Sequence, residues 1–388
     1  MEEETKKETK KEDIKKKPRK GNEDKMGAII HSAIGGAAGA FIGVFAASSL
    51  PDAGPAQTLI NLSVMLLLYF IAIFIQVIIH ESGHLVCGLL SGYRFLSFRI
   101  FNLMFSKENG KLKLKKYALK GTMGQCLLLA PETSDNNFPY VLYNLGGALF
   151  NFISCVLSAL LLLLLPGSQI ATYVFVAFLS AGLMFGLTNI IPLRAGGMAN
   201  DGYNIRLMNK SESERAGFKV MLSSAAFLAS GSSFENMPEE LRYVPENFNG
   251  PISVYPALFL LDYYMAMQDF KKAEELAEKI LEEGTDILLI HKNGIRCELL
   301  FLEIIGECRK EKIEQLYTKE LKKSISVSLG QPSILRLMYF YEKIVSKDNK
   351  KAEEMLKMFE KVCKTFPFPA NAEAEKRLVE MGLAIPNN

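Results

Sequence analysis

Two histidines and one glutamate form a short motif inside an apolar stretch of the chain. His80, Glu81 and His84 make a His-Glu-x-x-His sequence within residues 71–90, where most other side chains are apolar. On a helix, imidazoles four positions apart project from one face and can bind a single Zn²⁺. The intervening carboxylate is placed to accept a proton from zinc-activated water. The motif therefore indicates metal-dependent hydrolysis carried by a helix.

A purely structural role for the motif is the alternative. The chain has four histidines in 388 residues, so a chance match is a rare event, of order one in several hundred chains of this kind. Ionisable groups at membrane depth are costly and usually work or pair there. We therefore expect the motif to be functional.

The elements that must position this motif are four apolar stretches, each long enough to cross a bilayer core of about 30 Å at 1.5 Å per residue. They cover residues 27–50, 58–90, 140–165 and 170–193. The pattern predicts a polytopic membrane domain over residues 27–209. Before it, the first 25 residues hold ten basic and eight acidic side chains, so residues 1–26 are expected to be a disordered charged arm.

The distribution of Lys and Arg predicts how the chain crosses the membrane. Residues 51–57 and 166–169 contain neither, whereas residues 94–120 contain eight. Under the positive-inside rule both termini are cytoplasmic, and we expect a multi-pass protein of a bacterial cell membrane. The first stretch resembles a signal peptide in part, but its length favours a retained anchor.

A catalytic zinc site usually takes three protein ligands and leaves a fourth position open. His31 and His291 lie far from the motif in sequence, and Cys87 follows His84 by three residues. Cys87 is a possible ligand, although a free cysteine is commonly a small buried hydrophobe. A carboxylate near the membrane is the better candidate, and Asp201 is the first acidic residue after the fourth apolar stretch.

The surroundings of that carboxylate carry a family resemblance. Asn189 and Pro192 belong to Asn-Ile-Ile-Pro, and Asp201 is followed by glycine. With His-Glu-x-x-His on an earlier span, this resembles the site-2 protease family, the M50 intramembrane zinc metalloproteases. The resemblance covers residues 59–206 and implies that His80, His84 and Asp201 bind one zinc per chain. It also implies that Glu81 is the general base. The twelve residues from Asn189 to Asp201 are a longer spacing than the family's compact form has.

What the resemblance implies about activity is hydrolysis of peptide bonds in or near the transmembrane segment of a membrane protein or a signal-peptide-like substrate. The family also has a Gly-Pro-x-x-Asn on the intervening span. Here Gly147 and Asn151 keep the glycine and the asparagine without the proline. Asn151 is therefore expected to be catalytic, donating to the developing oxyanion. An interhelical hydrogen bond is the alternative.

Residues 94–114 partly alternate between apolar and polar side chains around Asn109-Gly110, a dipeptide that suits a type I′ turn. This resembles the membrane-associated β-hairpin with which the family is thought to hold its substrate extended. A loop anchored to anionic headgroups by its lysines is the alternative, and both roles can coexist.

Residues 210–388 are expected to form a cytoplasmic α-helical domain. Ala273, Ile313 and Ala352 recur at intervals of 40 and 39 in similar contexts, which predicts helical hairpins resembling tetratricopeptide repeats. An ordinary helical bundle is the alternative. Ser211, with Glu214 three residues on, is expected to cap the first helix after the membrane part. The predicted fold is thus an all-α polytopic membrane protein with about four spans and a short β-hairpin, followed by soluble helical repeats.

The expected partners are the bilayer, a membrane-protein or peptide substrate, and a protein bound to the helical domain. Net charge is only +3, which does not suggest nucleic acid. Two other readings remain: a non-proteolytic membrane zinc protein with an immunity or resistance role, and a tethered adaptor that works through its helical repeats. The substrate is open: a transmembrane regulator, a signal-peptide remnant and a peptide pheromone precursor all fit.

Overall fold

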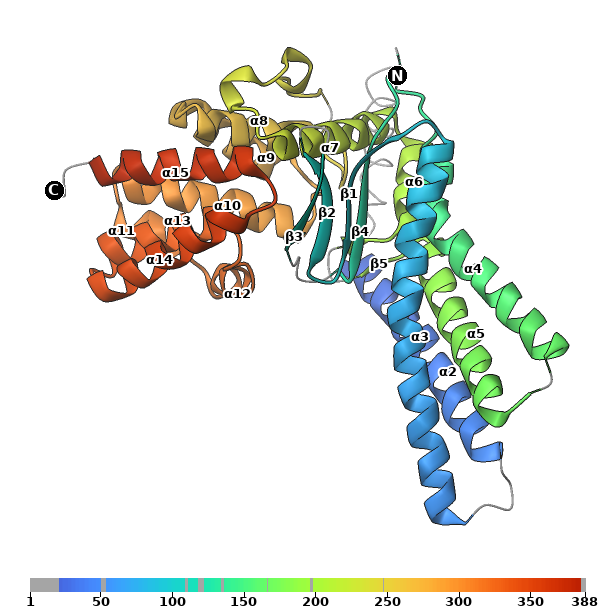
Figure 1. Cartoon of the computed structure of the whole chain (residues 1–388). Helices are drawn as coiled ribbons and strands as arrows, with labels where there is room; N and C mark the ends of the chain where they lie inside the picture. Colours follow the sequence, from blue (N-terminus) through green and yellow to red (C-terminus); the bar gives the residue numbers. More distant parts are fainter. Residues whose placement is uncertain are drawn as a thin grey trace, which may run out of the picture.

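The computed structural model describes residues 21–49, 54–108, 111–117, 122–133, 136–165, 167–195, 198–246 and 248–384. In Figure 1 a helical bundle tapers away from a small sheet, and a group of helices lies on the other side of that sheet. The expected disorder of residues 1–20 and the expected turn at Asn109-Gly110 concern residues outside the described ones.

The bundle consists of α2 (Gly21–Ser48), α3 (Pro55–Leu90), α4 (Tyr140–Leu164) and α5 (Gln169–Ile190). Within the described residues these are the four helices long and apolar enough to cross a membrane, as the sequence predicted. Helix α2 begins several residues before the expected span, because Glu23, Asp24 and Lys25 are helical rather than part of an arm. The four helices fit a multi-pass membrane protein.

Helix α3 is the longest element and carries the His-Glu-x-x-His motif. Pro55 is its first residue, where the missing N–H costs nothing. At the other end Gly92 adopts φ +84°, a conformation that side chains disfavour. The amide of Tyr93 then donates to the Gly88 carbonyl at 3.0 Å. This turn ends α3 and directs the chain into the sheet.

The sheet has four antiparallel strands in the order β3-β2-β1-β4. They are β1 (Arg94–Ile100), β2 (Leu103–Glu108), β3 (Lys111–Lys116) and β4 (Gly124–Leu129). The predicted hairpin is present as β2 and β3, which pair from Leu103 with Lys116 to Glu108 with Lys111. The sequence prediction missed β4 and treated β1 and β2 as one strand.

A short connection leads from α5 to the helices beyond the bundle. Strands β5 (Arg194–Ala195) and β6 (Met198–Ala199) pair with each other. They are followed by α6 (Asp201–Lys210) and α7 (Glu212–Ser230). The Ser211 hydroxyl caps α7, accepting from the Glu214 amide at 3.4 Å. The Glu214 carboxylate instead accepts from the amides of Ile252 and Ser253, both at 2.9 Å.

One ion-pair network joins three distant parts of the chain. The buried Arg194 guanidinium, on β5, contacts Asp24 of α2 at 3.2 Å and Asp286 of the later helical region at 3.1 Å. Gly27 lies so close to the Arg194 backbone that a Cβ would overlap it. The beginning of the bundle and the later helices are therefore both fastened to the short connection that precedes Asp201.

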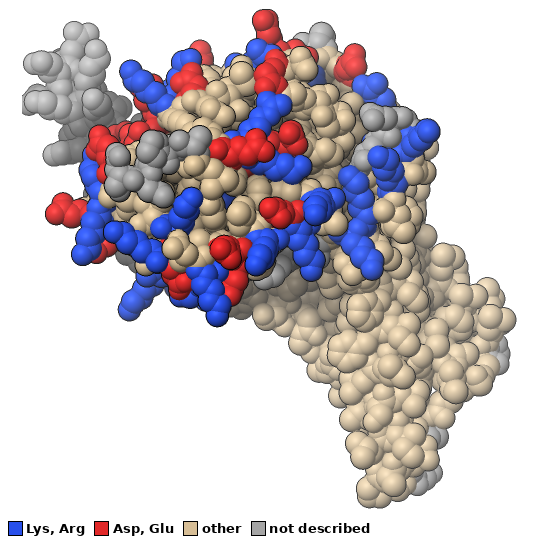
Figure 2. All heavy atoms as spheres, turned by 60° about the vertical axis from the view of Figure 1, so that its left-hand side comes forward, with Lys and Arg blue, Asp and Glu red and all other residues tan. Residues whose placement is uncertain are grey.

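Most of the remaining helices pack around one large apolar core, and residues 234–241 pack in a smaller one. The remaining helices are η2 (Phe234–Asn236), η3 (Glu239–Leu241), α8 (Tyr255–Ala266), α9 (Phe270–Glu283), α10 (Leu289–Ile305), α11 (Lys310–Leu316), α12 (Lys319–Val327), α13 (Pro332–Phe340), η4 (Tyr341–Val345), α14 (Asn349–Thr365) and α15 (Pro369–Ala384). In Figure 2 charged side chains are spread over this part of the molecule, whereas the tapering bundle is tan, the colour of residues other than Lys, Arg, Asp and Glu.

Three turns between these helices share one unusual conformation. Gln268, Cys308 and Lys347 have φ of +58°, +52° and +55°. Each lies two residues before the first residue of α9, α11 or α14. Left-handed backbone is uncommon in residues other than glycine, so three occurrences at similar intervals agree with the spacing seen in the sequence.

Candidate metal centre

The candidate site lies where α3, α4 and α6 meet. Gly83 of α3 and Gly146 of α4 are so close that a Cβ on either would overlap the carbonyl of the other. Because these two backbones touch, the nearby side chains of His80 and His84 on α3 lie directly against α4. The close helix contact therefore determines how His80 and His84 are surrounded.

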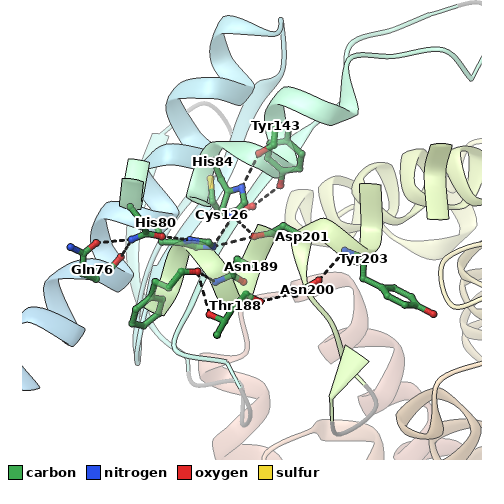
Figure 3. A network of polar contacts seen from close by, with 12 residues as sticks. Gln76, His80, His84, Cys126, Tyr143, Thr188, Asn189, Asn200, Asp201 and Tyr203 are labelled. Atoms are coloured by element: carbon green, nitrogen blue, oxygen red, sulfur yellow. Dashed lines mark hydrogen bonds and ion pairs between the residues drawn. The ribbon is translucent and has the colours of Figure 1, made fainter. Parts of the chain in front are cut away.

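The three expected ligands converge (Figure 3). The Asp201 Oδ2 atom lies 3.2 Å from His80 Nε2 and 3.3 Å from His84 Nε2. The two Nε2 atoms are 3.1 Å apart. Metal–ligand bonds of 2.0–2.1 Å in a tetrahedron put neighbouring ligand atoms about 3.3 Å apart. The three atoms thus occupy three corners of a zinc-sized tetrahedron.

The other ring nitrogens of both histidines are engaged. His84 Nδ1 donates to the Tyr143 carbonyl at 2.8 Å. His80 Nδ1 donates to Asn151 Oδ1, also at 2.8 Å. Each Nδ1–H therefore fixes the tautomer that leaves an Nε2 lone pair facing Asp201, which is how metal-binding histidines are commonly oriented.

The donor set fits zinc. Among the described residues, His80, His84 and Asp201 are the group of His, Cys, Asp and Glu side chains able to hold one ion. Buried Asp201 Oδ2 has no hydrogen-bond partner, which is costly unless a cation satisfies it. Burial would raise the pKa of the Asp201 carboxyl, but the two imidazoles outweigh it and bring that pKa below its ordinary range.

Asp201 is placed by its neighbour Asn200, which caps α6. The side-chain Oδ1 of Asn200 accepts from the backbone amides of Tyr203 at 2.9 Å and Leu193 at 3.1 Å. Its side-chain Nδ2 donates to the backbone carbonyls of Thr188 and Ile191, both at 2.6 Å. Asn200 therefore ties the end of α5 to the start of α6. The following Gly202 lies against the Ile190 and Asn189 carbonyls, where a Cβ would not fit.

Glu81 is buried beside the sheet. A Cβ at Gly124, the first residue of β4, would lie 2.5 Å from Glu81 Oε1. The start of β4 thus rests directly on this carboxylate. Glu81 follows the ligand His80 in sequence and is positioned between the metal centre and the sheet.

Asn151 is fully buried beside His80. Besides accepting from His80, it donates from Nδ2 to Gln76 Oε1 at 2.7 Å and to the Gln76 carbonyl at 3.1 Å. An oxyanion role would require the amide to leave Gln76. Cys87 is buried near Gly146 and does not belong to the group around Asp201.

Sequence reasoning did not identify Tyr143 or Asn200 as parts of this centre, and it noted Gly147 only as the glycine of the family's motif. A Cβ on Gly147 would lie 2.6 Å from the Nε2 atoms of both His80 and His84. Tyr143 acts through its backbone carbonyl, which carries no sequence signal. Asn200 is a strong helix-capping type directly before Asp201, and this signal was available.

The family model that describes peptidase family M50 matches residues 68–367, which are 300 of the 388 residues. The chain belongs to peptidase family M50. Membership implies a metalloprotease. The match continues well past residue 206, where the resemblance drawn from the motifs ended, and includes most of the helices after α7. Comparison with curated proteins and with solved structures gave no significant match.

Proposed function

We propose that this M50 protein is a zinc-dependent intramembrane protease that cleaves in or near the transmembrane segment of a membrane protein or signal-peptide-like substrate. The observation that carries the proposal is the triangle of ligand atoms on α3 and α6, with sides of 3.1, 3.2 and 3.3 Å. It lies on a helix whose apolar length suits a membrane span.

In this proposal His80, His84 and Asp201 hold one zinc ion. Zinc supplies Lewis-acid chemistry, polarising the scissile carbonyl and acidifying water. Glu81 takes the proton from the attacking water and transfers it to the leaving amine. Its burial beside Gly124 keeps the carboxylate at the position where β4 begins.

Asn151 has two possible roles, and its contacts favour one of them. Its carbonyl oxygen orients His80, and its amide is already bonded to Gln76. We therefore assign it mainly to positioning His80. The catalytic oxyanion role predicted from the family resemblance stays a prediction.

The sheet is proposed to present the substrate. An intact helix hides its carbonyls behind its own hydrogen bonds, so a scissile segment must be extended first. Among the described strands β4 pairs with β1 only, and the start of β4 contacts Glu81. A segment extended along this start, in the manner of strand addition, would lie beside Glu81 and the three expected ligands.

The proposed topology places both termini in the cytoplasm of a bacterial cell. Basic and acidic side chains gather on the part that holds the sheet and the later helices, away from the bundle (Figure 2). We propose that residues 210–388 form a cytoplasmic domain of tetratricopeptide-like helical hairpins that binds a protein partner. The three matching turns at Gln268, Cys308 and Lys347 support this.

The test is Glu81→Gln in the full chain, purified in detergent and reconstituted with membrane-protein substrates. We expect zinc content to be unchanged and peptide hydrolysis to fall by about 10²–10⁴-fold, the usual contribution of a general base. Comparing peptide termini in membranes of cells with either form identifies the substrate. Full hydrolysis by the variant would refute Glu81 as the general base. Absence of hydrolysis by the zinc-loaded wild type would instead favour the zinc-binding or adaptor readings.

A further inference from the structure

A surface hollow lies between α4, α5 and α6. It has a volume of about 350 Å³. Its lining consists of five residues without polar side-chain groups and three with them: Leu145, Ile190, Pro192, Gly202, Ile205, Arg206, Asn209 and Lys210. Such a mixture suits an amphipathic ligand.

The walls place this hollow at the level of the membrane surface. Leu145 lies in the second turn of α4, and Ile190 is the last residue of α5. The hollow is therefore formed by the adjoining ends of two candidate spans. Gly202 in its wall directly follows Asp201, so the hollow is level with the metal centre.

The polar groups stand on one face of α6. Arg206, Asn209 and Lys210 are spaced i, i+3 and i+4, so their side chains neighbour one another. All three are exposed. Within the described parts of the chain, neither Arg206 nor Lys210 makes an ion pair. The Arg206 guanidinium lies 5.8 Å from the centre of the Tyr203 ring.

Asn209 adds a third donor. Its Oδ1 accepts from the Tyr140 hydroxyl at 2.7 Å, which turns its amide group into a fixed donor beside the two cations. These three donors rim an apolar hollow. A phosphate group carried on an acyl glycerol provides the matching anion and the matching apolar chain.

We infer that this hollow binds an anionic phospholipid of the cytoplasmic leaflet. Its headgroup phosphate contacts Arg206, Asn209 and Lys210, and an acyl chain packs on Leu145 and Ile190. Basic pockets between span ends commonly take such headgroups. The inference rests on the proposed topology, which puts this end of the bundle at the cytoplasmic face of the membrane. The bound lipid bridges α4, α5 and α6, and so stabilises the connection that carries Asp201.

The experiment is native mass spectrometry of the full chain in detergent. Phosphatidylglycerol and phosphatidylcholine with identical acyl chains are titrated against the wild type and against the double variant Arg206→Gln with Lys210→Gln. The matched control is Lys357→Gln with Lys361→Gln, which removes two exposed lysines of α14. We expect the wild type to prefer phosphatidylglycerol and the first variant to bind it about 10- to 30-fold more weakly.

Two further comparisons test the roles of the positive charge and of the acyl chain. The charge-preserving pair Arg206→Lys with Lys210→Arg should keep the preference. Inorganic phosphate should not displace the lipid, since it lacks the acyl chain. Equal binding of both lipids by the wild type, or an equal loss in the control variant, would overturn the inference. Zinc content and thermal unfolding of each variant check folding without reference to protease activity.

Discussion

Gly147 should be required for zinc binding although it donates nothing to the metal. In Gly147→Ala the new Cβ would lie 2.6 Å from the Nε2 atoms of His80 and His84, where ordinary contacts begin at 3.4 Å. Relief needs a shift of about 0.8 Å, the difference between these distances, whereas zinc bond lengths tolerate about 0.2 Å. Mutation of a residue that only hydrogen-bonds to a metal ligand typically costs 10–100-fold in metal affinity. We therefore expect a loss of about 100-fold or more, or about 2.7 kcal/mol of binding free energy.

The assay is zinc content by elemental analysis of purified protein, followed by competition with a chelator of known affinity. Gly39→Ala is the matched control, because that glycine also lies in a membrane-length helix but its added Cβ would meet no atom within 4 Å. It should bind zinc normally. A Gly147→Ala protein that folds, melts like the wild type and binds zinc with unchanged affinity would refute the geometry of the His pair.

Two further predictions concern stability. Asn200→Ala removes the α6 cap and four hydrogen bonds, so we expect about 2–4 kcal/mol less stability and weaker zinc binding, measured by thermal unfolding and chelator competition. Asn204→Ala on the same helix is the control, and equal losses in both would contradict the role of Asn200. Burial lowers the pKa of His291 to about 4, below the ordinary value of about 6.5. Protonation of His291 therefore favours the unfolded state. The free energy of unfolding is highest above pH 6.5 and falls on acidification, by about 2 kcal/mol at pH 5. His291→Phe keeps a ring packed on Tyr255 but removes the titrating group. Thermal unfolding at pH 7.5 and pH 5 should therefore show that the variant has lost this pH dependence of stability. An undiminished dependence would contradict its assignment to His291.

The parts of the site that the sequence predicted depend on local geometry or on the family resemblance. The facing of His80 and His84 follows from helix periodicity alone, whereas Asp201 was predicted from its position after the fourth apolar stretch together with the family resemblance. The Tyr143 carbonyl and the Gly147 contact arise only when α3 and α4 touch at Gly83 and Gly146. The residue pattern of a single helix does not encode this contact between two helices.

The sheet shows the same limit for a different reason. Strands β1 and β2 join through Phe101, which has φ +53°, and sequence rules look for glycine or asparagine at such a position. The turn was therefore read as continuous strand. Strand β4 has an apolar sequence, GQCLLL, without the alternation that marks a half-buried strand. Its identity follows from pairing with β1, which is a tertiary property.

The Arg194 network bears on how this protein can be divided. One buried guanidinium is neutralised by carboxylates from residue 24 and residue 286, and it precedes Asp201, the proposed zinc ligand, by seven positions. A fragment that omits the first helix, or one that stops after α6, keeps the cation but loses half of its countercharge. Neither piece is then a smaller version of the whole. We therefore expect either fragment to be less stable than the full chain, and a chimera that exchanges one of the two parts should carry a matching acid at residue 24 or residue 286.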